Sequence, residues 1–197
     1  MDVEKFFVDY RQEVLPIYAD YVALTKVIPQ QVLVEISNAF SHLSQYYNGK
    51  NSSEDKYGNL VKAHGHLVRI SLDLHKMVWD EEGKLLKNWL GAGLFSALSF
   101  NLDSAELNKK YSDFLRLGAE ARRHELENVG IAPEESIERY DKVCAIGAEL
   151  IENIDKAKLH RLALVARFLT AKEFLSGLVL GVLSSLLAQW LWIHLAK

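Results

Sequence analysis

The last part of the chain constrains it most strongly, because residues 174–195 form a stretch of 22 residues without a formal charge. A helix of that length reaches roughly 33 Å, which is enough to cross the bilayer's hydrocarbon core of about 30 Å. We therefore expect one transmembrane helix over residues 170–197. Residues 1–169 are left to form a single helical sensor or assembly domain.

Small or polar residues recur along one side of this stretch. They are Gly177, Gly181, Ser184, Ser185 and Gln189, here called the small-residue stripe. Four-residue spacing keeps residues on one slowly drifting side of a helix, small side chains let helix backbones touch, and a glutamine can hydrogen-bond across the interface. The stripe predicts contacts between copies of the chain. In an assembly of four or more copies it would instead line a narrow polar pore with Glu173 at its mouth, whereas a plain membrane anchor is the simplest alternative.

The flanks of the stretch predict its orientation. Five basic residues precede it closely, namely Lys156, Lys158, Arg161, Arg167 and Lys172, whereas only Lys197 follows it. Positive residues stay on the cytoplasmic side, so we expect a single-pass protein of the inner membrane with a cytoplasmic N-terminal domain. Cys144 is the only cysteine, which excludes an internal disulfide and a multi-cysteine zinc site.

The rest of the chain predicts an all-α fold, because it has three prolines and apolar residues recur at helical spacing almost throughout. We expect a bundle of about six helices, over residues 2–27 with a kink at Pro16, 29–47, 53–79, 84–100, 103–128 and 133–169. The second should bury Val32, Leu33, Ile36, Phe40, Leu43 and Tyr47. The third should end at the acidic turn 80–83. The sixth either gives way to a new helix at Thr170 or continues into the membrane.

A second apolar run covers residues 89–100. Twelve helical residues reach only about 18 Å, which is too short to cross a bilayer. We expect a core helix whose small residues allow close packing, and an interfacial or re-entrant membrane segment is the alternative.

Four cations follow one side of the expected third helix. They are Lys62, His66, Arg69 and Lys76, with Asp73 among them, and are here called the cationic stripe. Arginine and lysine bind phosphates well, so the stripe predicts a nucleotide-phosphate site, with Arg122 and Arg123 as a second group of candidates. The alternative is a solvated helix face paired with its own acids. Up to residue 173 the chain has 26 acidic and 22 basic residues, so any anion site must be local.

Enzymatic motifs are missing from the sequence: there is no phosphate-binding glycine loop, nucleophile elbow or metal-ligand cluster. We expect a protein without catalytic residues, cofactor or metal. Two short patterns offer weaker alternatives. Arg69 and His75 resemble the Arg-x(4–6)-His element of HEPN-type ribonucleases, although Ile70 replaces the usual polar residue. Residues 88–91 resemble part of the Asn-Trp-Gly-Arg motif of Bcl-2-like regulators, but an extra leucine interrupts it and its arginine is absent.

The layout of the whole chain, a compact helical domain followed by one self-associating span, resembles small membrane effectors of bacterial nucleotide-signalled antiphage systems, in particular the Hailong-type channel subunit. This resemblance implies that a nucleotide or short oligonucleotide binds the soluble domain and that the protomers of a homo-oligomer, with a tetramer expected, then rearrange. Their spans, surrounded by membrane lipid, would form an ion channel that depolarises the membrane. The competing hypothesis is a tail-anchored helical scaffold that recruits a protein partner and contains no channel.

Overall fold

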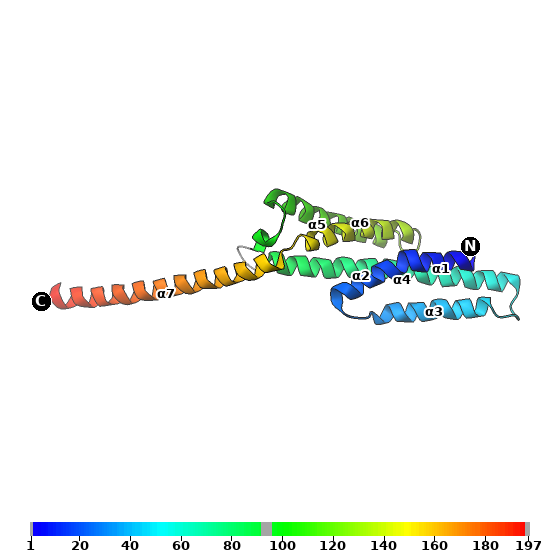
Figure 1. The fold of residues 1–197 in the computed structure, drawn as a ribbon, viewed down its shortest axis with the longest axis horizontal. Helices are drawn as coiled ribbons and strands as arrows, with labels where there is room; N and C mark the ends of the chain where they lie inside the picture. Colours follow the sequence, from blue (N-terminus) through cyan, green and yellow to red (C-terminus); the bar gives the residue numbers. More distant parts are fainter. Residues whose placement is uncertain (1, 92–95, 196–197) are drawn as a thin grey trace. The chain divides into compact units, whose positions relative to one another are not determined.

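A computed structural model describes residues 2–91 and 96–195, and in these residues the predicted all-α fold is confirmed (Figure 1). The described residues form six α-helices, α1 to α6, before a last helix, α7, and they contain no strand. The chain divides into two compact units. One comprises residues 1–88 and 104–152, and the other comprises residues 89–103 and 153–197.

The N-terminal segment, predicted as one helix, consists of three consecutive helical pieces. α1 (Val3–Asp9) begins at Asp2, whose carboxylate accepts a hydrogen bond of 2.7 Å from the Lys5 backbone N–H. A π-helical turn (Tyr10–Val14) joins it to α2 (Leu15–Thr25). Proline has no N–H and its ring clashes with the carbonyl four residues earlier, so a wider turn directly before Pro16 lets the helix continue past it.

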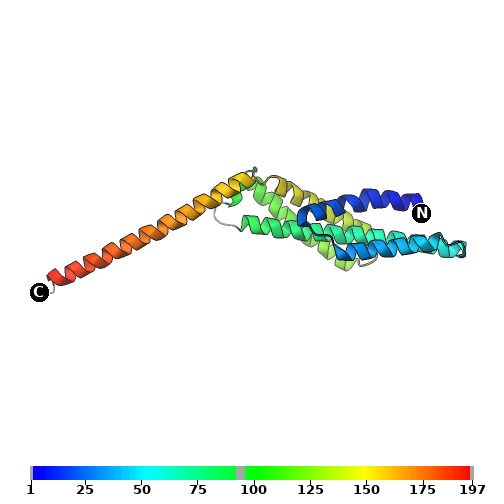
Figure 2. The same cartoon turned by 60° about the horizontal axis from the view of Figure 1, so that its bottom comes forward.

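α3 (Gln30–Tyr46) lies beside α4 in both views, at the outside of its unit (Figure 1, Figure 2). Of the six side chains expected in the core, Val32 and Leu43 are buried and Ile36 is partly buried. The expectation is wrong for Leu33, Phe40 and Tyr47, which are 45%, 51% and 68% exposed. An outer helix has neighbours on one side only, so its buried surface is narrower than its apolar surface.

α4 (Ser53–Leu90) is a single helix of 38 residues, so the expected turn at residues 80–83 is wrong. Two acids of the expected turn form ion pairs along this helix, because Lys84 contacts Asp80 at 2.6 Å and Glu81 at 2.7 Å. A helix therefore accommodates this acidic sequence without a break.

The expected helix over residues 84–100 is also wrong beyond Leu90, where α4 ends. Within the second apolar run, residues 92–95 lie outside the described residues. The run closes in a 3₁₀ turn (Ser96–Ser99), after which Phe100 is buried. The described part of this run is therefore not one continuous core helix.

α5 (Ser104–Glu127) and α6 (Pro133–Glu152) begin close to where their caps predict. Gly130 between them has φ +74°, a left-handed conformation that glycine adopts without strain. These two helices pack against each other within the first unit.

The expectation that the sixth helix runs to residue 169 is wrong, because α6 ends at Glu152 and α7 (Lys156–Leu195) begins after a short extended segment. The Asp155 N–H donates to the Ser99 carbonyl at 2.8 Å, and the Asn101 N–H donates to the Asn153 carbonyl at 2.7 Å. The Asp155 carboxylate accepts bonds from the N–H groups of residues 157 and 158 at 2.9 Å each and so caps α7. α7 then passes residue 170 without interruption, so the expected domain boundary at 169/170 falls inside it. The side chain of Thr170 lies outside the described ones.

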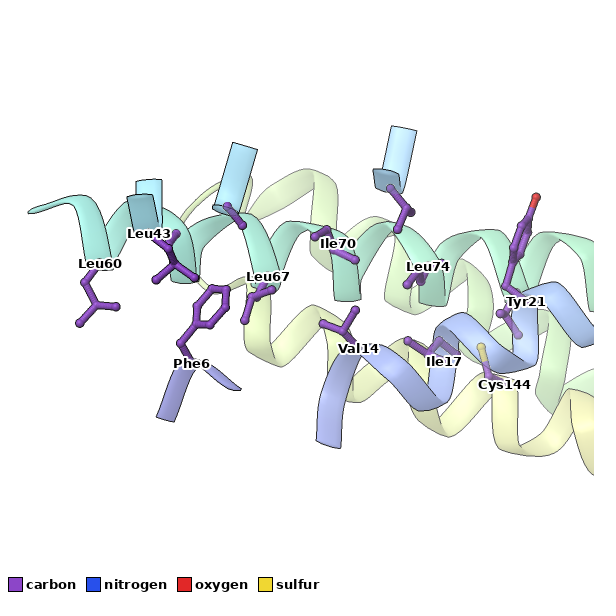
Figure 3. Close-up of a cluster of buried hydrophobic side chains, with 14 residues drawn as sticks. Phe6, Val14, Ile17, Tyr21, Leu43, Leu60, Leu67, Ile70, Leu74 and Cys144 are labelled. Atoms are coloured by element: carbon purple, nitrogen blue, oxygen red, sulfur yellow. The ribbon is translucent and has the colours of Figure 1, made fainter. Parts of the chain in front are cut away.

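The core of the first unit forms where the N-terminal helices meet α4 (Figure 3). Figure 3 shows Phe6, Val14 and Ile17 pointing toward α4. The α4 side chains that receive them include Leu60, Leu67, Ile70 and Leu74, all at most 3% exposed. Their spacing of three, four and seven residues is that of one apolar side of a helix.

One carboxylic acid interrupts the buried side of α4. Glu82 is only 3% exposed, and its Oε2 atom has no hydrogen-bond partner among the described residues. Gly147 of α6 makes room for it, because a Cβ atom at that position would collide with Oε2 of Glu82. Burial, with a smaller contribution from the charge of Asp20, raises the pKa of Glu82 to about 8.

Glu82 should make the stability of the domain fall with rising pH. The folded state holds this proton more tightly than the unfolded state, whose carboxyl has the ordinary pKa of 4.5, so stability is lost as the pH rises from 4.5 to about 8. Glu82→Gln should remove this dependence and raise the free energy of unfolding at pH 9 by roughly 3–5 kcal/mol. Urea unfolding of the full chain in detergent, followed by circular dichroism at pH 5 and pH 9, measures it.

The control for this experiment is Glu138→Gln, which changes an exposed acid of α6 and should leave the pH dependence as in the wild type. A Glu82→Gln protein whose stability still falls between pH 5 and pH 9 as steeply as that of the wild type would contradict the prediction.

Candidate functional site

α7 is, among the described helices, the one that is long and apolar enough to cross a membrane. Every residue from 171 to 189 is exposed, so no other described part of the chain covers this segment. Large apolar side chains are among them: Phe174 is 72% exposed and Leu180 is 67% exposed. Such a continuous exposed apolar surface requires lipid or other protein chains as its surroundings.

The small-residue stripe lies on this uncovered segment, and all five of its residues are exposed. A Cβ atom placed on Gly177 or Gly181 would meet no atom within 4 Å, so both backbones are open to a neighbouring helix. The Ser184 hydroxyl donates to the Gly181 carbonyl at 2.9 Å and thus satisfies its donor within its own helix. Ser185 and Gln189 are the polar members left to contact a neighbour. Glu173, the expected pore mouth, is exposed four residues before Gly177.

The first part of the cationic stripe faces a carboxylate of α3. The His66 Nδ1 atom lies 2.5 Å from one Glu35 oxygen, and an Arg69 guanidinium nitrogen lies 3.5 Å from the other. The His66 ring also stacks on His42, with ring centres 5.3 Å apart. Lys62 is exposed one turn away. Sequence reasoning missed Glu35, since helical periodicity relates residues of one helix and Glu35 is 31 positions before His66.

The second part joins the two groups of candidates that were predicted separately. Lys76 of α4 lies 3.1 Å from one Glu125 oxygen and 2.7 Å from Asp73, while Arg122 donates to the other Glu125 oxygen at 2.8 Å. The Tyr140 hydroxyl of α6 also donates to Glu125, at 3.0 Å. This arrangement, here called the Glu125 cluster, connects α4, α5 and α6.

The Glu125 cluster shifts the ionisation of its members. Burial alone raises the pKa of a carboxyl, but the bonds from Lys76, Arg122 and Tyr140 outweigh it and hold the pKa of Glu125 below its usual value. Burial likewise opposes the charge of Lys76, but bonds to Asp73 and Glu125 raise its pKa. All these charges therefore persist at neutral pH.

These contacts change what the cationic stripe can do. His66 and Arg69 share Glu35, and Lys76 and Arg122 share Glu125, so a phosphate must compete with a carboxylate at both places. Lys62 and Arg123 are the exposed candidates for which the described structure records no acidic partner. Two exposed tyrosines, Tyr47 and Tyr57, lie at the end of α3 and the start of α4, where a nucleotide base could stack.

The structure also places the two residues of the ribonuclease-like pattern. Arg69 has a side chain 60% exposed, whereas the side chain of His75 is 7% exposed and its Nδ1 lies 2.7 Å from the Ser71 carbonyl. One points to solvent and the other into the bundle, so they do not share a surface. Within the described ranges, no three His, Cys, Asp or Glu side chains converge on a possible metal position.

Comparisons of the chain with known protein families, curated proteins and solved structures give no match. Its function must therefore be argued from α7, the cationic stripe and the surfaces around them.

The Glu125 cluster generates a prediction about stability. Glu125→Gln keeps the shape of the side chain but removes the charge that compensates Lys76 and Arg122. Because it leaves the partly buried Lys76 and the exposed Arg122 without their shared carboxylate, we expect the free energy of unfolding at pH 7 to fall by about 1–3 kcal/mol. Urea unfolding in detergent measures this loss. Glu127→Gln, an exposed acid on the same helix, is the matched control, and equal stability of the two variants would show that the cluster contributes nothing.

Proposed function

We propose that this protein is a homo-oligomeric channel of the bacterial inner membrane, with α7 as its single span and a cytoplasmic helical domain that binds a nucleotide or short oligonucleotide. Binding rearranges the protomers, and their α7 helices then conduct ions and depolarise the membrane. The resemblance to effectors of nucleotide-signalled antiphage systems gives this activity its role in antiviral defence. The expected assembly is a tetramer.

The observation that carries the proposal is the uncovered small-residue stripe on an otherwise leucine-rich helix. Gly177 and Gly181 leave the backbone open, and exposed Gln189 would be unsatisfied in lipid unless a second helix or water met it. A plain anchor needs none of these features. Contact between copies along the stripe would cover the open backbone at both glycines and give Gln189 a hydrogen-bond partner.

The proposed signal must reach the beginning of α7, which is hydrogen-bonded to residues 99–101 of the same unit. The stripe lies on α4, and the segment that follows α4 is hydrogen-bonded to the beginning of α7. In that segment the Asn101 side chain accepts a bond from Lys158 at 2.5 Å, and the Ser99 carbonyl accepts one from Asp155 at 2.8 Å. These bonds hold residues 99–101 to the start of α7, which continues to Leu195, within the second unit.

The span is tested by enlarging one stripe residue. Gly181→Leu should separate neighbouring α7 helices and lower ion flux through proteoliposomes at least tenfold, while the protein stays in the membrane. Ser176→Leu is the matched control, because this small-to-large change lies about 140° around the helix from Gly181 and should leave flux within about twofold. A Gly181→Leu protein that conducts like the wild type would remove the channel proposal.

The ligand site is tested with a labelled mixed-sequence hexanucleotide, as RNA and as DNA. Lys62→Gln combined with Arg69→Gln should weaken its binding to the detergent-solubilised protein at least tenfold, since each cation contributes to phosphate attraction. Arg139→Gln with Lys142→Gln, two exposed cations of α6, is the control of equal charge. Equal losses in both double variants would show non-specific charge attraction and would eliminate the cationic stripe as the site.

A second candidate function, a membrane-anchored scaffold, is favoured by one observation. α3 exposes Leu33, Val34 and Phe40 by 45–58%, an apolar surface suited to a protein partner. Replacing α7 from residue 174 onward with an unrelated single span distinguishes the two functions. A scaffold keeps its biological activity after this exchange, whereas a channel loses it.

A further inference from the structure

We propose that the exposed side of α3 pairs with the same side of α3 in a second copy of the chain, with the two helices antiparallel. α3 lies at the outside of the first unit, beside α4 (Figure 1, Figure 2). The pairing extends the proposed homo-oligomer by an interface in the helical domain. It needs no conduction through α7, so it holds or fails independently of the channel.

The exposed side of α3 carries no charge, although 25% of the residues in the chain are charged. Glu35 is the one Asp, Glu, Lys or Arg residue of this helix. Its side chain is only 13% exposed and contacts His66 and Arg69 of α4. His42 is held in the same way, since its Nδ1 atom lies 3.0 Å from the side-chain oxygen of Asn59 on α4. Both groups are therefore used inside the unit, and the side that α3 presents to its surroundings is uncharged.

One row of exposed residues on this side has the spacing of a coiled-coil seam. Steps of three and four residues alternate along it, so the row follows one face of the helix. Large side chains alternate with polar ones, and the large ones leave an apolar surface open. The row, here called the α3 seam, consists of Gln30, Leu33, Ser37, Phe40, Ser44 and Tyr47.

An antiparallel copy matches the α3 seam in size. In antiparallel coiled coils the two kinds of seam position face each other, whereas in parallel ones each kind faces itself. Leu33 then faces Ser44 of the second copy. Phe40 faces Ser37 in the same way, so each large side chain lies over a small one. Parallel pairing would instead set phenylalanine against phenylalanine and serine against serine, which crowds one layer and leaves space in the next.

The polar members of the α3 seam can be covered without losing hydrogen bonds. Antiparallel pairing places Tyr47 against Gln30 of the second copy, and a phenol hydroxyl and an amide can donate to each other. Beside the seam, the Ser41 hydroxyl donates to the Ser37 carbonyl at 3.0 Å. The same bond to the carbonyl four residues earlier is open to Ser37 and Ser44. Pairing therefore buries no charge and leaves no hydroxyl without an acceptor.

A second copy fits this surface better than other occupants do. Nucleic acids and anionic membranes attract cations, and no exposed residue of α3 is Lys or Arg. A twofold axis brings each surface against itself, so a charged surface would repel its copy and an uncharged one does not. A foreign protein would not require a seam that matches its own reversed order. The size match therefore favours self-pairing.

The pairing should be weak in dilute solution, because α3 has only 17 residues. A stable interface between proteins buries about 800 Å² per partner, and a single pair of such short helices does not reach that area. Confinement of the copies to one membrane raises their effective concentration and compensates for the small area. The test must therefore be made in a bilayer.

Cross-linking of the full chain in proteoliposomes, with a short bismaleimide that joins two cysteines, tests the pairing. Ser37→Cys should link to its own copy, because the antiparallel register separates the two positions by only about 4.5 Å along the helix axis. Gln30→Cys should not link, since the same register places it about 26 Å from its copy. Ser112→Cys, at an exposed serine of α5, measures random collisions, and Ser37→Cys should exceed it by about fivefold or more. The wild type, whose single Cys144 is buried, gives the background.

A charge placed in the α3 seam should break the pair. Ser44→Glu sets a carboxylate against Leu33 of the second copy and should lower the cross-linking of Ser37→Cys by about fivefold or more. Ser112→Glu is the matched control and should leave it unchanged. Both substitutions change an exposed serine, so neither disturbs the core. Ion flux through the same vesicles reports on the channel separately: cross-linking without flux overturns the channel alone, and flux without cross-linking overturns the α3 pairing alone.

Three results would overturn the α3 pairing. Ser37→Cys that cross-links no better than Ser112→Cys is the result expected if a foreign protein or lipid covers α3. Equal cross-linking of Gln30→Cys and Ser37→Cys indicates parallel helices and excludes the antiparallel pair. Cross-linking that Ser44→Glu does not reduce shows that the contact between copies lies elsewhere.

Discussion

The first unit depends on one constraint: α4 must keep the same side buried along most of its 38 residues. Leu60, Leu67 and Leu74 keep that side at regular spacing, and the N-terminal helices pack against it. The constraint persists where the sequence turns acidic, so residue 82 faces inward although it is a glutamate. Gly147 opposite it, the raised pKa and the unpaired oxygen are all consequences of placing a carboxyl on the buried side of one continuous helix.

Local signals predicted the fold wherever local chemistry decides it. The start of α5 at Ser104, the left-handed Gly130 and the initial Pro133 of α6 are each favoured by the sequence within a few residues, so they can be recognised without tertiary information. The helix boundaries that were predicted wrongly depend on contacts that the local sequence does not reveal. Residues 80–83 resemble a turn until their ion pairs and inward packing are known. The break at residues 153–155 depends on hydrogen bonds to Ser99 and Asn101, more than 50 positions earlier.

In the candidate site too, the sequence predicts contacts within one helix but not ion pairs between helices. Helical spacing grouped His66, Arg69 and Lys76 along α4, yet it could not reveal that Glu35 and Glu125 approach them from α3 and α5. Charge compensation between helices is therefore what separates an apparent phosphate site from a structural network. It leaves Lys62 and Arg123 as the exposed candidates for which the described structure records no acidic partner.

α7 follows a different physical rule from the rest of the chain. The first unit buries one side of each helix and pairs its internal charges, whereas the segment from residue 171 to 189 buries nothing in the described chain. Lipid can satisfy its leucines, but it offers no hydrogen bond to Gln189 and gains little from the open backbone at Gly177 and Gly181. Lipid alone therefore accounts for the leucines of this helix but not for its open backbone and its glutamine.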